Sequence, residues 1–575
     1  MKHKIKDLSK EKLQDIILEM AELLSKEQYI KLEAIVEACM TDKVEPEKIQ
    51  PMVRMSQEFV DGKMKLYESW MKEIDEGDLY LDVDEYEDYS SGYWDSEWIT
   101  DYYDNQGIGD KLATIIQFAK DCVDDRWYQE ANYIYEWLWE MSVNTDSEYE
   151  CDPVDLELLA EKDIIRTDME QLALLTLYAD YQTQVPGKRV EDIYLYFAYN
   201  TFRKLHIEDM FRVGRENLEG EEQFWKDWIA LLKTKTGEAE GRLLKEAVLY
   251  HDGVEGLAKT ADENCSVHPS LYLSVMEEYI KKHDYVQMEK IGESALEKIT
   301  VSLVIRSEIA LKAAYASTCL MHADNVMRFC WESFRSDSND RNFLRLFGTE
   351  EMAKQYGMRG REVFRSKLKG NPEANTRNPE LRQNIIGDTM YHILSFYIGD
   401  FERVKEASKN PKGSLGWSSS FIRYGIRLFL LYLYEESLPS KAAASIAGYI
   451  GFQDTKDMNF ALPFENEVIE ESRKNHTSAF WNYFQRWKPF FKMSQEDRQK
   501  YLFWAEKIVY SRADAIVGGQ HRGHYGEVAV LLSMVAEIKA SMGCPNASNE
   551  IFQEYRKKFP RHSSFQAEMR SYFEV

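Results

Sequence analysis

The stretch RSEIALKAAYASTCLMHAD (306–324), followed by NVMRFCWESFRSD (325–337), decides the fold. Its first half is an apolar run rich in Ala and Leu, residue types that lose little rotamer freedom in a helix. A short turn follows, and the second half is an amphipathic run that contains a Glu. The stretch therefore predicts two helices joined by a turn, with the small residue Ala313 at the point where they cross.

Units of this kind, roughly 30–37 residues long, recur along the chain. The same pattern occurs at 111–141, 270–299 and 526–559, and small residues such as Ala131 and Ala295 sit where the helices of a pair would cross. A single helix pair cannot bury its apolar face and must stack on its neighbours. We therefore expect an all-α fold, an α-solenoid of tetratricopeptide-like helix hairpins. A helical bundle whose hairpins only happen to have this length is the alternative.

The length and composition of the chain agree with a stack of repeated units. A chain of 575 residues is too long for one compact core, and 13 Pro and 29 Gly are few for a protein with many strands. Changes in composition predict four parts. They are an N-terminal helical hairpin region (1–74), an acidic aromatic-rich linker or loop (75–106), a helical-repeat region (107–370) and a C-terminal helical-repeat region (371–575).

The net charge and the cysteines limit the function classes. With 72 Lys and Arg against 99 Asp and Glu, the net charge of −27 argues against a general binder of nucleic acids or anionic membranes. The most apolar stretch, 421–434, contains Arg423 and Arg427 and is too short to span a bilayer, so no membrane partner is expected. The N-terminus does not resemble a signal peptide. Seven scattered Cys suggest neither disulfides nor zinc, and we expect a cytoplasmic protein.

An acidic segment is the first candidate site. Residues 73–110 carry fourteen Asp and Glu and no Lys or Arg. The part from 75 to 106 lacks helical periodicity, and its carboxylates alternate with aromatic rings, a combination that suits docking to a basic partner. A solvated acidic loop is the alternative, and the glycine that a calcium loop requires is missing. The candidate partner-binding residues are Asp82, Asp84, Tyr86, Tyr89, Trp94 and Trp98.

Two basic regions are the other candidates. Residues 358–378 hold six Lys or Arg against two Glu, with Arg359, Arg361 and Arg365 as candidate contacts. They form a partner surface or a solvated helix face.

The second basic region is 512–525, where Arg512, Arg522 and His524 surround the Gly518–Gly519 pair just before a predicted helix. The two glycines indicate a positive φ or a close approach of the backbone. A helix N-terminus favours an anion, so an internal salt bridge, an external phosphate and a metal are open alternatives, in that order. No metal site is assigned.

The last eighty residues resemble the tail of uncharacterised bacterial helical proteins, some of which carry a SWIM-type zinc finger elsewhere. The residues that carry the resemblance are RADAIV (512–517), HRG (521–523), YG (525–526), EYR (554–556) and PRH (560–562). The finger requires a CxC pair followed by CxH, and neither occurs in this chain, so no zinc role carries over. The resemblance implies a helical-repeat fold in a bacterial cell.

The motifs of common catalytic and cofactor sites are missing from the chain. There is no GxxxxGK[ST], GxGxxG after a strand, HExxH or GxSxG, so neither an enzymatic activity nor a cofactor is predicted. We expect a protein–protein interaction scaffold or adaptor whose main partner is another protein. The alternative is a nucleic-acid-associated or anion-binding effector that uses the basic patches at 358–378 and 512–525.

Overall fold

The computed structural model describes residues 54–88, 97–146, 152–365, 367, 378–409, 413–452 and 470–573. These residues separate into two compact units. The first unit holds the described residues up to Thr183 together with Val213–Glu216. The second holds Gln184–Arg212 and the described residues from Asn217 onward. Helices make up most of both units, as predicted.

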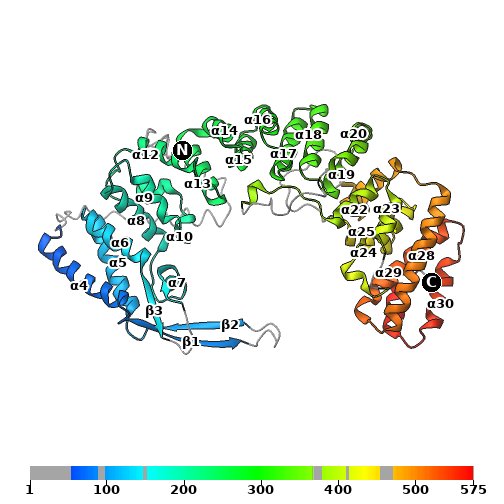
Figure 1. The fold of residues 1–575 in the computed structure, drawn as a ribbon, viewed down its shortest axis with the longest axis horizontal. Coiled ribbons are helices and arrows are strands. Elements are labelled where there is room, and N and C mark those ends of the chain that lie inside the picture. The colour runs from blue at the N-terminus through cyan, green and yellow to red at the C-terminus, as the bar shows by residue number, and fades with distance from the viewer. Residues whose placement is uncertain are drawn as a thin grey trace, which may run out of the picture. The chain divides into compact units, whose positions relative to one another are not determined.

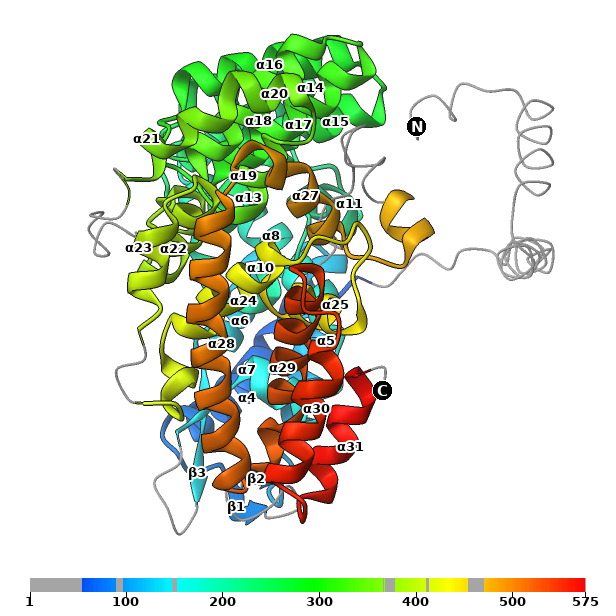
Figure 2. The same cartoon turned by 90° about the vertical axis from the view of Figure 1, so that its right-hand side faces the viewer.

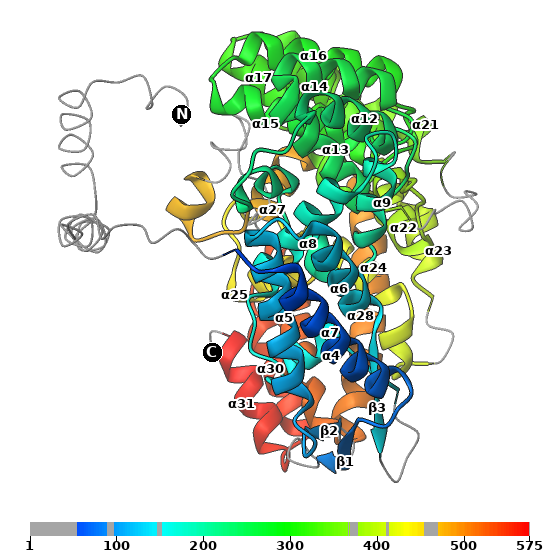
Figure 3. The same ribbon diagram turned by 90° about the vertical axis from the view of Figure 1, so that its left-hand side faces the viewer.

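The first unit combines helices with a small sheet. Its helices are α4 (Gln57–Asp75), α5 (Ile108–Asp124), α6 (Tyr128–Glu140), α7 (Leu156–Glu161) and α8 (Met169–Thr183). Its strands are β1 (Tyr80–Asp88), β2 (Glu97–Tyr103), β3 (Ser142–Asp146) and β4 (Val154–Asp155). Helix α4 lies beside α5 (Figure 3). The two helices pack through the rings of Tyr67 and Phe118, whose centroids lie 5.1 Å apart.

The four strands form one sheet in the order β2-β1-β3-β4. Strand β1 pairs with β2 in antiparallel register and with β3 in parallel register, and β3 pairs with β4 in antiparallel register (Figure 1). The sequence predicted a linker or loop over 75–106 and no sheet, and that prediction is wrong. Because β3 follows β1 by more than fifty residues, no local sequence pattern predicts the pairing of these two strands.

Strand β1 places its side chains alternately on two faces. Leu81 and Val83 are buried, whereas Asp82 is half-buried and Asp84 and Tyr86 are exposed. This period of two is the pattern of a half-buried strand. Leu81 and Val83 anchor the segment in the core of the first unit. Asp82 and Asp84 face the other way, whereas the half-buried Glu85 lies on the same face as Leu81 and Val83.

The second unit is helical throughout its described residues, apart from a single bridge between Leu303 and Gln383. Its helices as far as the middle of the unit are α9 (Arg189–Tyr196), α10 (Asn200–Arg203), η1 (Ile207–Asp209), α11 (Met210–Val213, whose last residue belongs to the first unit), α12 (Glu221–Leu232), α13 (Glu238–His251), α14 (Gly253–Asn264), α15 (Ser270–Lys281), α16 (Tyr285–Lys298), α17 (Ile305–Cys319), α18 (Ala323–Ser336), α19 (Asp340–Arg345), α20 (Glu350–Tyr356), η2 (Gly357–Arg359) and α21 (Gly360–Arg365).

The remaining helices of the second unit follow. They are η4 (Pro379–Leu381), α22 (Asp388–Tyr397), α23 (Phe401–Ala407), η5 (Gly416–Ser419), α24 (Ile422–Leu433), α25 (Lys441–Ile450), α27 (Ala479–Trp487), η6 (Lys488–Phe490), α28 (Gln495–Gly518), η7 (Arg522–His524), α29 (Tyr525–Ser541), α30 (Ala547–Lys558) and α31 (Ser563–Tyr572). The domain boundary expected between residues 370 and 371 lies outside the described residues.

Helices α12 to α18 form a row in which each helix packs against the next (Figure 1). In addition, α13 contacts α15, α14 contacts α16, and α15 contacts α17. The hairpins predicted at 270–299 and 306–337 are the pairs α15–α16 and α17–α18, while those at 111–141 and 526–559 are α5–α6 and α29–α30. The alanines placed at the crossings, Ala131, Ala295 and Ala313, are fully buried.

A very close approach in this row lies between α16 and α17. A Cβ atom added to Gly292 of α16 would stand 2.5 Å from the Cβ of Ala313 on α17 and 3.3 Å from Cε of Met276. Non-bonded carbon atoms do not come as close as the first distance, so the two helices meet at a spacing that requires glycine at position 292.

Gly292→Ala is therefore expected to lower the free energy of unfolding by about 1–3 kcal/mol through overpacking, despite the better helix propensity of alanine. The control is the same substitution at Gly448, an exposed glycine in α25 whose added Cβ meets nothing within 4 Å. Gly448→Ala should leave stability unchanged or raise it by up to about 1 kcal/mol. Urea denaturation measures both, and equal effects at the two positions would contradict the close contact.

The C-terminal helices of the second unit gather around α24 and α29. Helix α24 contacts α22, α23, α25, α28 and α29, and α29 also contacts α25, α28, α30 and α31. Figure 2 shows α28, α29, α30 and α31 side by side in the orange and red part of the chain. Among the described residues, none of the helices is both long and apolar enough to cross a bilayer.

Candidate functional site

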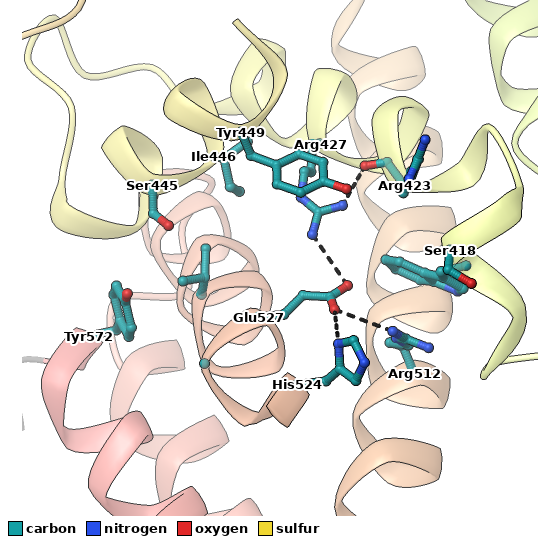
Figure 4. A pocket seen from close by; sticks show the side chains of 13 residues that line it. Ser418, Arg423, Arg427, Ser445, Ile446, Tyr449, Arg512, His524, Glu527 and Tyr572 are labelled. Atoms are coloured by element: carbon teal, nitrogen blue, oxygen red, sulfur yellow. Dashed lines mark hydrogen bonds and ion pairs between the residues drawn. The ribbon is translucent and has the colours of Figure 1, made fainter. Parts of the chain in front are cut away.

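A pocket of about 470 Å³ opens among the C-terminal helices of the second unit (Figure 4). Its walls come from η5 and η7 and from α24, α25, α28, α29 and α31. The lining residues are Trp417, Ser418, Arg423, Arg427, Ser445, Ile446, Tyr449, Arg512, His524, Gly526, Glu527, Val530 and Tyr572. Both charged and aromatic side chains are prominent among them, so the pocket is the candidate functional site.

Helix α24 contributes Arg427 from an almost wholly apolar sequence, IRYGIRLFLLYL. Its side chain is only 6% exposed, and it donates from Nη1 to the backbone oxygen of Arg423 at 2.5 Å. The guanidinium also lies over the ring of Tyr449, with its carbon 4.0 Å from the ring centroid. Such a cation–π contact partly replaces the water that a buried guanidinium loses.

Helix α28 contributes Arg512 from the opposite wall. The helix begins at Gln495, where Ser494 caps it by accepting a hydrogen bond from the backbone N–H of Asp497 at 3.0 Å. The Arg512 side chain is 4% exposed, donates from Nη1 to the backbone oxygen of Ser414 at 2.8 Å, and lies 4.9 Å from the ring centroid of Trp417. Each of the two buried arginines thus contacts a backbone carbonyl and an aromatic ring of its own.

The carboxylate of Glu527, in the first turn of α29, joins the two arginines (Figure 4). Its Oε1 lies 3.3 Å from Nη2 of Arg427, and its Oε2 lies 3.3 Å from Nη2 of Arg512 and 3.3 Å from Nδ1 of His524. Charge-assisted hydrogen bonds of this kind are usually about 2.7–2.9 Å long. The carboxylate of Glu527 therefore interacts with three partners, and each of the three distances is longer than that of a usual charge-assisted hydrogen bond.

The site has more buried positive charge than negative charge. Two guanidinium groups face one carboxylate, which leaves one positive charge uncompensated before His524 and the half-buried Arg423 are considered. Burial lowers the pKa of Arg427 below its ordinary value, and the nearby Glu527 offsets part of that effect. A local positive excess in a chain of net charge −27 favours an anionic ligand.

Two buried N–H groups on the pocket wall find no acceptor among the described residues. They are Nε of Arg512 and Nε1 of Trp417, whose side chains are almost completely buried. A buried donor without an acceptor costs about 1–3 kcal/mol. Both nitrogen atoms have almost no accessible surface, so an acceptor reaches them only when neighbouring side chains shift.

The structure brings together two of the residues that the sequence singled out near the C-terminus. Arg512 and His524 both line the pocket, whereas Arg522 is exposed on η7 and does not. Their first partner is the internal carboxylate of Glu527. Of the two alternatives expected for the glycine pair, the positive φ falls on Gln520 (φ 56°), while Gly519 has a φ of −82°. Gly519 serves close approach instead, since an added Cβ would stand 2.9 Å from the backbone oxygen of Ala515.

The arginines of the other basic region lie outside this pocket. Arg359 is exposed at the end of η2 and lies over the ring of Trp331, 5.1 Å from its centroid. Arg361 is exposed on α21, and Arg365 ends that helix. Most of the region from 366 to 377 lies outside the described residues.

The acidic candidates belong to the first unit. Asp82, Asp84 and Tyr86 lie on β1, and Tyr86 donates a hydrogen bond to Asp101 of β2 at 3.3 Å. Trp98 lies on β2, paired with Glu87 of β1. Tyr89 and Trp94 lie outside the described residues.

Arg427, Tyr449 and Glu527 were not predicted from the sequence as site residues. A signal was present, because two arginines four residues apart in an apolar helix place both charges on one face, where each needs a partner. Nothing in the sequence identified that partner as Glu527, one hundred positions further along.

Among the described residues, no group of three or more His, Cys, Asp or Glu side chains is arranged to hold a metal ion. Comparison with known proteins assigns no family: no family model, curated protein or solved structure matches the chain.

Proposed function

We propose that this protein is a helical-repeat binding protein, an α-solenoid of tetratricopeptide-like hairpins, and that it binds another protein. In α12 to α18 each helix packs on the next and several pack on the next but one, the contact pattern that stacked hairpins produce. The buried crossing alanines and the close approach at Gly292 support the same arrangement. Solenoids of this type present extended surfaces to partner proteins.

The recognition site for an acidic group of the partner is the pocket around Arg427 and Arg512. The observation that carries this proposal is that two buried guanidinium groups share one carboxylate at a distance of 3.3 Å each, on the wall of a pocket of about 470 Å³. An ion-pair network that only stabilises the fold does not require a pocket beside it, whereas a network that binds a ligand does. An added anion would relieve the excess positive charge.

The cysteines support a cytoplasmic setting for this binding function. The five cysteines within the described residues, Cys122, Cys265, Cys319, Cys330 and Cys544, are free thiols. Free thiols persist in reducing compartments, whereas extracellular proteins tend to pair them.

Affinity purification from the native host with three baits tests the proposal. The first bait is the unchanged protein, and the second is Ser445→Trp, which places a large ring at the exposed pocket wall without touching the ion pairs. The third is Arg522→Met, a change on η7 outside the pocket. We expect a partner protein that the first and third baits retain and that Ser445→Trp loses by about tenfold or more.

Equal recovery with all three baits would contradict a binding role for the pocket. Sequencing of co-purified nucleic acid tests the alternative, in which Arg359, Arg361, Arg365 and Arg522 contact phosphates. That alternative predicts nucleic acid whose recovery falls steeply with salt and falls further in Arg522→Met.

A further inference from the structure

We infer that the pocket binds the C-terminal carboxylate of a partner polypeptide whose last residue is apolar. This inference rests on the proposed function and names the chemistry of its ligand. Its basis is the balance of charge in the pocket, the two buried donors on its wall, and the apolar surface that surrounds them.

The charge balance favours a group with a single negative charge. Arg427 and Arg512 together carry two positive charges, and Glu527 supplies one negative charge at 3.3 Å from each. A carboxylate brings the buried charge to zero. A phosphate monoester would bring a second negative charge near the carboxylate of Glu527, where like charges repel. Among the lining residues only the half-buried Arg423 and the exposed His524 could offset that second charge.

The free donors suit a carboxylate as well. Nε of Arg512 and Nε1 of Trp417 are buried and have no acceptor among the described residues. A carboxylate accepts through two oxygens and has about four lone-pair positions. It therefore has lone pairs left to accept from these two donors, once the side chains around them shift, while it faces the guanidinium of Arg427.

The volume of the pocket and the residues that line it indicate which chemical groups of the ligand lie next to its carboxylate. About 470 Å³ is far more than a carboxylate fills, so part of the attached group lies inside the pocket as well. Ile446 and Val530 supply apolar surface, and Tyr449 and Tyr572 supply rings. The hydroxyl groups of Ser418 and Ser445 provide hydrogen-bonding partners for a peptide group. An apolar side chain beside a terminal peptide bond matches this lining.

The test uses four small probes and the full-length protein, with binding measured by saturation-transfer NMR and calorimetry. The first probe is acetyl-Gly-Phe with a free carboxylate, and the second is the same dipeptide as its C-terminal amide. The third is acetyl-Gly-phosphoserine amide, and the fourth is hydrocinnamate, which keeps the carboxylate and the ring but lacks the peptide bond. The variants Ser445→Trp and Arg512→Met are compared with the unchanged protein.

We expect the free dipeptide acid to bind with a dissociation constant of about a millimolar or below. The amide should bind at least about tenfold more weakly, because it cannot pair with the buried charge. Both variants should abolish the binding of the acid. Arg512→Met leaves Glu527 paired with Arg427, and thermal denaturation confirms that each variant is folded.

Each other outcome overturns the inference in a distinct way. Tighter binding of the phosphoserine probe would show that the pocket takes phosphorylated partners. Equal binding of hydrocinnamate would show that it takes small organic acids rather than polypeptide ends. If no probe binds and Ser445→Trp still loses the partner, the inference fails and the proposed function stands. If no probe binds and that variant keeps every partner, both fail.

Discussion

Glu527→Ala is expected to lower the free energy of unfolding by about 3–5 kcal/mol, the cost of breaking a buried ion pair by removing one partner. Glu527 is the carboxylate that Arg427 and Arg512 share, and their side chains are 6% and 4% exposed. Its removal leaves two guanidinium groups buried without a counter-charge. Desolvation of an uncompensated charge is among the largest penalties that a single substitution produces.

The matched control is Glu550→Ala. Glu550 also lies in the first turn of its helix, α30, but it is exposed. Both substitutions remove the favourable interaction of a carboxylate with a helix N-terminus, which is worth about 0.3–1 kcal/mol. The difference between the two variants in urea denaturation therefore isolates the ion pairs. A difference below about 1 kcal/mol would contradict the view that Glu527 holds two buried charges.

Trp487→Ala should also lower the free energy of unfolding, by about 3–5 kcal/mol. Trp487 ends α27, is fully buried, and donates from Nε1 to the backbone oxygen of Tyr397 at 2.7 Å. Its ring centroid lies 5.1 Å from that of Tyr397, 5.5 Å from that of Phe491 and 6.0 Å from that of Tyr432. Alanine would leave a large cavity and an unsatisfied carbonyl at the end of α22.

Tyr432 lies on α24, the helix that carries Arg427, so this cavity should also weaken binding at the pocket. Trp487→Phe should cost less than the alanine substitution, because it keeps most of the volume and loses mainly the hydrogen bond. Phe503→Ala is the control, since Phe503 is 72% exposed on α28 and its removal should change stability by less than about 0.5 kcal/mol. Chemical denaturation of the three variants gives the comparison, and similar effects of Trp487→Ala and Phe503→Ala would contradict the packing described.

The hairpins were predictable from sequence because a helix is a local structure. Its hydrogen bonds join residues four positions apart, so composition and spacing within about fifteen residues carry the signal. The run from Ser270 to Ile299 shows this, because the turn at His283–Asp284 separates two apolar stripes and the structure places α15 and α16 on either side of it. The small residues at the crossings were identified for the same reason.

The sheet was not predictable in the same way. Leu81 and Val83 alternate with Asp82 and Asp84, so the period of a strand is visible in the sequence. One short strand, however, is not stable unless other strands pair with it. Strand β1 pairs with β2, which begins after eight intervening residues, and with β3, which follows only after α5 and α6. The high density of carboxylates also suggested a solvated loop, whereas Asp82 and Asp84 occupy one face of a strand whose other face carries the buried Leu81 and Val83.

The sequence by itself determined that the chain is mainly helical, where several of its helix pairs lie, and that a basic turn precedes the helix at the C-terminus. Tertiary structure alone decided that Arg427, Arg512 and Glu527, from three different helices, meet at one pocket. The physical reason is that a buried charge requires a partner but does not specify which one. Only the packing of α24, α28 and α29 brings one carboxylate within 3.3 Å of both guanidinium groups.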